Sequence, residues 1–274
     1  MVDSARANIL RFNFELDAID DIAPWGKGDD RGLHWFGLTS GHYWISTPLG
    51  EALRYTDQQI REWGSGSPYV DYQIARIFED LQCVLPSAIE PVPAEIAALI
   101  SDGGWMESVE VQLNSLDESD EGKKLYEIFW DATDWYGQRS FDTAYLVDGP
   151  NFCFWRVKDD VHFRWRIHGE SAIHRWCLPQ GQFTVAAEQF ESAAYSFFEE
   201  VLAKTEERVE RIATTGWHRT DCKLDVPLLV SEQRQRSNWI GDLRKRRSKT
   251  DWDAVRKLVN RLSTELSIPT PINH

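Results

Sequence analysis

The sequence has 274 residues and a formal net charge of −14 at pH 7, and 12% of its residues are aromatic, including 13 tryptophans. This length is enough to bury a sizeable core without disulfide or metal staples. The acidic charge argues against general nucleic-acid binding, for which a basic surface is expected, and it favours a basic protein partner.

Cysteine usage and hydropathy predict a cytoplasmic protein. The four cysteines, Cys83, Cys153, Cys177 and Cys222, are far apart and include no C-x-x-C pair. We therefore expect reduced thiols, and neither a disulfide framework nor a zinc ribbon. The first ten residues lack the apolar run of a signal peptide, and no segment approaches 18 uncharged apolar residues. Neither export nor a membrane span is expected.

The N-terminal part is predicted to form a small antiparallel meander over residues 8–55. Apolar and polar residues alternate from Ile9 to Leu16, which is typical of a strand with one buried face. A loop rich in Gly and Asp, which holds Trp25, follows this strand. The runs 33–38, 42–46 and 52–55 are expected to be further strands.

Residues 57–138 are predicted to be mainly helical. Thr56 and Gln59 have the spacing of a capping box at a helix start. Apolar residues that recur three and four apart from Val70 to Leu85 indicate a strong amphipathic helix, which we expect Pro86 to end. Shorter helices are predicted at 96–100, 105–113 and 124–135.

The segment from Asp160 to His168 alternates so cleanly that it predicts a strand with two chemically opposed faces. A turn at 158–160 joins it to a strand at 152–157, so the pair is expected to be a β-hairpin within a sheet that spans 151–186. Further strands are predicted at 173–178 and near Phe183, after a turn at 179–181. The apolar face carries Val161, Phe163, Trp165 and Ile167, and the cationic face carries His162, Arg164, Arg166 and His168.

The C-terminal part, residues 187–268, is predicted to be helical. The longest helix is expected at 187–213, followed by helices at 229–246 and after a second capping box at 250–253. Helices and antiparallel strands occur in runs and do not alternate. This order predicts an α+β fold, in which antiparallel sheets pack against a helical layer within a single domain of residues 1–274.

Charge is distributed unevenly along the chain. Residues 57–135 carry 17 acidic and 4 basic residues, whereas residues 231–261 carry 10 basic and 4 acidic residues. Either the basic tail packs over the acidic helices, or the acidic segment faces a basic protein partner and steers its approach. The candidate partner-binding residues are Asp117, Glu118, Asp120, Glu121 and the loop residue Trp25, whose ring would otherwise fold back over the core.

The cationic strand face offers an alternative site. Arginine presents forked donors to phosphate or carboxylate, and histidine adds charge as the pH falls. Arg156, His162, Arg164, Arg166 and His168 are therefore candidate ligands for an anionic small molecule or nucleotide. Otherwise this face is solvated or covered by acidic helix residues. No metal is expected there, because six residues of strand separate His162 from His168 by roughly 20 Å.

The sequence contains no motif that assigns a reaction. It lacks a G-x-S-x-G elbow, an H-E-x-x-H helix, a P-loop and a G-x-G-x-x-G turn. We therefore predict no catalytic residue and no cofactor. Tryptophans on predicted strands would suit a carbohydrate-binding platform if they were exposed together, but Trp165 lies on the apolar face and is expected in the core.

A set of short segments is spread over most of the chain, at residues 11–16, 24–26, 33–39, 41–45, 69–73, 79–81 and 190–209. Together, as one unit, they resemble a bacterial protein family of unknown function. The resemblance implies no reaction and no catalytic residue. Acidic, single-domain proteins of this type look like immunity proteins that neutralise toxins. The leading hypothesis is an intracellular factor of this kind that binds a basic partner.

Overall fold

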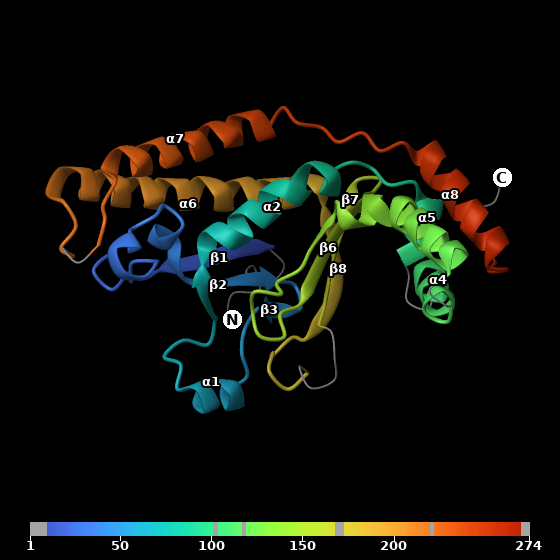
Figure 1. The fold of residues 1–274 in the computed structure, drawn as a ribbon, viewed down its shortest axis with the longest axis horizontal. Helices are drawn as coiled ribbons and strands as arrows, with labels where there is room; N and C mark the ends of the chain where they lie inside the picture. Colours follow the sequence, from blue (N-terminus) through green and yellow to red (C-terminus); the bar gives the residue numbers. More distant parts are fainter. Residues whose placement is uncertain (1–9, 101–103, 117–118, 168–172, 220–221, 270–274) are drawn as a thin grey trace, which may run out of the picture.

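The computed structural model describes the chain except residues 1–9, 101–103, 117–118, 168–172, 220–221 and 270–274. Within the described residues, the chain forms two four-stranded antiparallel sheets and eight α-helices (Figure 1). Strands of both sheets contact helices. The predicted α+β class is confirmed.

The first sheet is the predicted meander with one strand added. It contains β1 (Arg11–Leu16), β2 (Ser40–Thr47), β3 (Gly50–Ala52) and β4 (Val70–Gln73), and β2 pairs with each of the other three. The prediction of a strand at 33–38 is wrong. That run is buried against α6 (Ala187–Thr215) and α7 (Val226–Leu243), and the indole of Trp35 donates a hydrogen bond to Gln233 at 2.7 Å. Apolar residues buried by helices mimic the alternation of a strand.

The predicted start of the first long helix is also wrong, because residues 70–73 form β4 and pair with β2. Helix α2 (Ile74–Ala88) follows and continues through Pro86. Pro86 has no N–H to donate to the Gln82 carbonyl, yet the helix continues to Ala88, two residues later than expected. The short α1 (Asp57–Trp63) begins as predicted, since the Thr56 hydroxyl accepts from the Gln59 N–H.

The second sheet has the order β5–β6–β7–β8. Its strands are β5 (Ser140–Phe141), β6 (Asn151–Val157), β7 (Asp160–Arg166) and β8 (Gln180–Ala186). The predicted hairpin is confirmed, with Val157 opposite Asp160. The predicted strand at 173–178 is wrong, because only Trp176 makes a single bridge there. Instead β8 covers seven residues, including part of the predicted turn at 179–181.

The remaining helices match the predicted ones with shifted ends. Asp251, and not Thr250, caps the last helix. Helix α7 runs along α6, and α8 packs on α5 at the other end of the molecule (Figure 1). The helices other than α1 and α2 are α3 (Ala94–Ala97), α4 (Trp105–Asn114), α5 (Asp120–Gly137), α6 (Ala187–Thr215), α7 (Val226–Leu243) and α8 (Trp252–Glu265).

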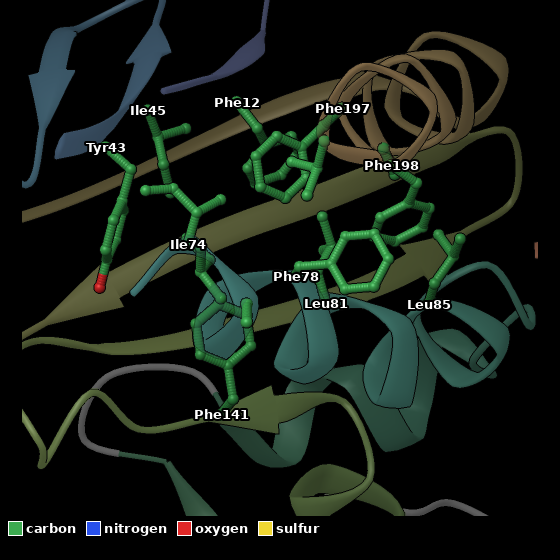
Figure 2. Packing of buried hydrophobic residues seen from close by; sticks show 14 of the residues in the cluster. Phe12, Tyr43, Ile45, Ile74, Phe78, Leu81, Leu85, Phe141, Phe197 and Phe198 are labelled. Atoms are coloured by element: carbon green, nitrogen blue, oxygen red, sulfur yellow. The ribbon is translucent and has the colours of Figure 1, made fainter. Parts of the chain in front are cut away.

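Two hydrophobic clusters lie on opposite faces of the second sheet. The larger one joins the first sheet, α2 and α6 to the Phe152 and Phe154 face of β6, and Figure 2 shows phenylalanines of β1, α2 and α6 packed in it. The smaller one joins α3, α4, α5 and α8 to the opposite face, through Cys153 and Trp155. Helices therefore cover both faces of this sheet, including much of the face that carries the cationic residues.

Candidate functional site

The cationic face of the second sheet makes many contacts with the helices over it. The Arg164 guanidinium lies 5.4 Å from the ring centroid of Trp155 and donates hydrogen bonds to the Ile100 carbonyl and the Tyr136 hydroxyl. The His162 ring stacks on Trp155 at a centroid distance of 5.1 Å, and burial lowers the pKa of His162. These two side chains therefore contribute to packing.

The other candidate anion ligands do not gather around them. The guanidinium of Arg156 donates to the carbonyls of Lys158 and Ile89 at the turn end of the hairpin. Arg166 lies at the opposite end of β7, half exposed, with a guanidinium nitrogen 3.6 Å from a Glu107 carboxylate oxygen. His168 lies outside the described residues. The structure thus brings together Arg164 and Arg166, but not Arg156.

These two arginines line a groove of about 800 Å³ between α4, α5 and the second sheet. Acidic side chains outnumber them in its walls. Trp130 also lines the groove, and 67% of its surface is exposed. It precedes Asp131 on α5, and Asp134 lies one helical turn further on. The carboxylates that line the groove are Glu107, Glu110, Asp131, Asp134 and Asp142.

The acidic residues expected to contact a partner lie further along α5. Asp120 and Glu121 are exposed in its first turn, where a negative charge also favours the helix N-terminus. Asp120 is three helical turns from Asp131, about 16 Å along the same side, with the basic Lys124 between them. Asp117 and Glu118 lie outside the described residues. The described part of the predicted patch therefore extends the acidic side of the groove.

Trp25 does not share a surface with these acidic residues. Its ring packs on Phe36 at a centroid distance of 5.5 Å, and 41% of its surface is exposed. The loop that holds it lies beside the C-terminal half of α6, whereas α4 and α5 lie at the far end of the molecule (Figure 1). One compact partner-binding surface cannot include both.

Sequence reasoning missed Trp130, although the helix around it was predicted. Leu125, Ile128, Phe129 and Ala132 form the buried stripe of α5, and Trp130 falls outside that stripe. A large aromatic residue on the polar side of an amphipathic helix is the signal that identifies it. The glutamates of α4 and Asp142 have no comparable signal, because only the tertiary structure brings them to α5.

A family model matches residues 11–258 of the chain. The chain belongs to DUF5984, a family of unknown function. The resemblance to such a family is therefore confirmed, and DUF5984 membership assigns no activity and no residue role. Comparisons with curated proteins and with solved structures find no match.

The basic tail packs over part of the acidic segment, as one of the two interpretations of the charge pattern predicted. Arg236 of α7 pairs with Glu79 of α2 at 3.1 Å, and Arg256 of α8 pairs with Glu95 of α3 at 2.6 Å. These pairs leave the groove carboxylates of α5 facing outward. Packing by the basic tail therefore accounts for Glu79 and Glu95, and the groove carboxylates of α5 stay candidates for a partner.

A second acidic hollow, of about 840 Å³, lies over the first sheet. Asp17 lines it, and burial and then the neighbouring Asp71 raise the pKa of the Asp17 carboxyl group. The His42 Nδ1 lies 3.9 Å from an Asp17 carboxylate oxygen. The charged and aromatic residues that line this hollow are Glu15, Asp17, His42, Asp71, Tyr55, Trp63 and Tyr69.

The described residues contain no group of three or more His, Cys, Asp or Glu side chains that could hold a metal ion. No helix in the described part of the chain is long and apolar enough to cross a membrane. All four cysteines are free thiols, and burial raises the pKa of the Cys153 thiol to about 11, which makes it a weak nucleophile near neutral pH.

Proposed function

We propose that this protein binds a basic protein partner at the acidic groove between α4, α5 and the second sheet. The observation that carries the proposal is the combination of five groove carboxylates with the exposed ring of Trp130. Arginine or lysine side chains of the partner can contact the carboxylates and lie over the indole. An exposed tryptophan within a polar rim is a favourable anchor for such an interface.

The charge of the whole molecule supports this choice. A net charge of −14 attracts a basic partner over a distance, and a concave acidic surface focuses that attraction. In its more specific form, the proposal is a bacterial immunity or defence factor in the cytoplasm. Its binding then occupies the active or receptor-binding surface of a basic partner and neutralises it.

An anionic ligand at the arginines fits the groove less well. Two guanidinium groups face five carboxylates, and Arg164 already contacts Ile100 and Tyr136. A phosphate group entering there would meet a net negative wall. We therefore expect inorganic phosphate to leave the thermal unfolding temperature unchanged; an increase that Arg164→Ala abolishes would favour the anion site.

The first test reverses the charge of the groove. Tagged wild-type protein and the triple variant Glu110→Lys, Asp131→Lys, Asp134→Lys are used to capture proteins from a lysate of the host at low salt. We expect the wild type to retain one basic protein in stoichiometric amount, which elutes by a few hundred millimolar salt because exposed charges are screened. The triple variant should retain less than a tenth as much.

A matched triple variant controls for charge alone. Glu206→Lys, Glu207→Lys and Glu210→Lys change the net charge equally on an exposed part of α6. This control should capture the partner as the wild type does. If both triple variants lost the partner equally, net charge alone would explain the interaction. If both captured as much partner as the wild type, the groove would be excluded as the binding site. Trp130→Ala should weaken capture tenfold or more, whereas Trp239→Ala on α7 should not.

A further inference from the structure

Strand β8 forms one edge of the second sheet. Two backbone hydrogen bonds show which residues of β8 bond to β7 and which point their backbone groups away from it. The N–H of Ile167 donates to the carbonyl of Pro179, and the N–H of Ala187 donates to the carbonyl of Asp159. In an antiparallel pair, the positions that exchange hydrogen bonds recur every two residues. The odd-numbered residues of β8 therefore bond to β7, and the even-numbered ones point their backbone groups away from it.

The outward groups belong to Gln180, Gln182 and Thr184, together with the N–H of Ala186. None of them makes a backbone hydrogen bond in the part of the chain that the structure describes. Beside them lies a hollow of about 530 Å³, whose walls include Phe183, Thr184, Leu10 and Pro48. Among the residues that the structure describes, no segment pairs with this edge of β8, so it is available to another strand.

Edge strands in natural proteins are usually protected from pairing by charged residues, prolines or short length. Among the described edge strands, β1 carries Arg11 and Glu15, β3 carries Glu51, β4 carries Asp71, and β5 has only two residues. Strand β8 has seven residues, Gln-Gly-Gln-Phe-Thr-Val-Ala, with no charge and no proline. Strand β8 is therefore a long edge strand that neither a charged residue nor a proline protects.

We propose that a second copy of this chain pairs with β8 in an antiparallel arrangement, so that the two sheets become one continuous sheet across a twofold axis. The outward positions determine the register. Gln182 of one copy exchanges both backbone hydrogen bonds with Thr184 of the other, and the twofold axis passes between the two Phe183 residues. Phe183 then faces its counterpart at a non-hydrogen-bonded position, where cross-strand side chains approach most closely.

Charges at the ends of the sheet favour the antiparallel direction. Asp160 lies opposite Ala186 at one end of the β7–β8 pair, and Arg166 lies opposite Gln180 at the other end. An antiparallel dimer brings Arg166 of one copy to the end that holds Asp160 of the other, whereas a parallel dimer would place like charges together. Three strand spacings, about 14 Å, separate them, so this effect selects direction and adds little affinity.

The test measures the mass of the full-length protein by sedimentation velocity from low micromolar to about 1 mM. We expect a reversible monomer–dimer equilibrium, which salt strengthens because each copy carries a charge of −14. Gln182→Pro and Thr184→Pro each remove one outward N–H and should weaken dimerisation at least tenfold. The matched Gln182→Ala and Thr184→Ala retain that N–H and should dimerise as the wild type does.

Hydrogen exchange of the wild type provides a readout that needs no variant. In the dimer, the amides of Gln182 and Thr184 should gain protection as concentration rises, while those of Phe183 and Val185 stay protected throughout. A monomer at every concentration would overturn the proposal, and so would a dimer that both proline variants retain or whose β8 amides stay unprotected. The triple charge reversal of the groove lies on another surface, so it separates this proposal from the proposed function.

Discussion

At the scale of single residues, buried charges in this protein differ in how well they are paired. Arg139 is fully buried, but its guanidinium donates to the Glu90 carboxylate and the Trp135 carbonyl at 2.5 and 2.7 Å. Asp80 is less well compensated. Its side chain is 13% exposed, its nearest cation is Arg76 at 3.4 Å, and its buried Oδ2 accepts no hydrogen bond within the described chain. Burial, reinforced by Asp142 and Glu79, raises its pKa to about 6.

This shift predicts a specific pH dependence of stability. Because the folded pKa of Asp80 lies above its ordinary value of 3.8, the folded state binds the proton more tightly, and the free energy of unfolding falls as pH rises from about 4 to 6. Asp80→Asn should remove that fall and stabilise the protein at pH 7 by up to about 3 kcal/mol. Urea unfolding between pH 4 and 8 measures both effects. Asp131→Asn, at an exposed carboxylate, should keep the wild-type slope, and an unchanged slope in Asp80→Asn would contradict the assignment.

At the scale of elements, the position of β8 depends on a close approach between two strands. Gly181 lies opposite Trp165 of β7, and a Cβ atom at residue 181 would lie 2.3 Å from the indole ring. The indole is itself buried and donates to the Leu178 carbonyl, so it cannot move aside without losing that bond. Residue 181 must therefore be glycine because Trp165 packs against it, and not because the chain turns there. The glycine made residues 179–181 look like a turn, so the strand was predicted only near Phe183.

Gly181→Ala should consequently destabilise the fold by about 1–3 kcal/mol, the usual cost of overpacking a core. The midpoint of guanidinium unfolding measures this change. Gly66→Ala is the matched control, since a Cβ there meets no atom within 4 Å. We expect it to be neutral or slightly stabilising, because alanine lowers the entropy of the unfolded chain. Equal midpoints for the two variants would show that the indole relaxes freely.

At the scale of the whole molecule, the two hydrophobic clusters lie on opposite faces of the second sheet. The smaller cluster positions α4 and α5, and hence both helical walls of the groove, and α8 closes it with Val255, Val259 and Leu262. The groove thus depends on a C-terminal helix that contributes no residue to its lining. Helix α8 acts on the site by holding α5 in place.

Leu262→Ala should therefore destabilise the protein by about 2–5 kcal/mol through the cavity that it creates. Hydrogen exchange should show the largest loss of amide protection in α4, α5 and α8, with little loss in β1 and β2, since subregions of a protein open separately. Leu228→Ala, at an exposed position of α7, is the control and should change neither. A uniform loss of protection across both sheets would mean that the clusters unfold as one unit.

The sequence by itself determined the local elements. Periodic apolar residues predicted the meander, the β6–β7 hairpin and the long α6, because each of these elements buries one face whose spacing appears directly in the chain. It failed at 33–38 and at β8. In the first segment helices bury an irregular run from several sides, and in β8 a glycine fits beneath Trp165. Neither cause is local in sequence.

Only the tertiary structure decided where the charges lie relative to one another. The sequence showed an acidic segment and a cationic strand, but not that α4 and α5 cover that strand and bring Arg164 and Arg166 into a groove with five carboxylates. It also could not show that Trp25 is remote from α5, or that the edge of β8 is open. Such proximities depend on how distant segments pack, and packing follows from the shape of the complete core, which no short stretch of sequence contains.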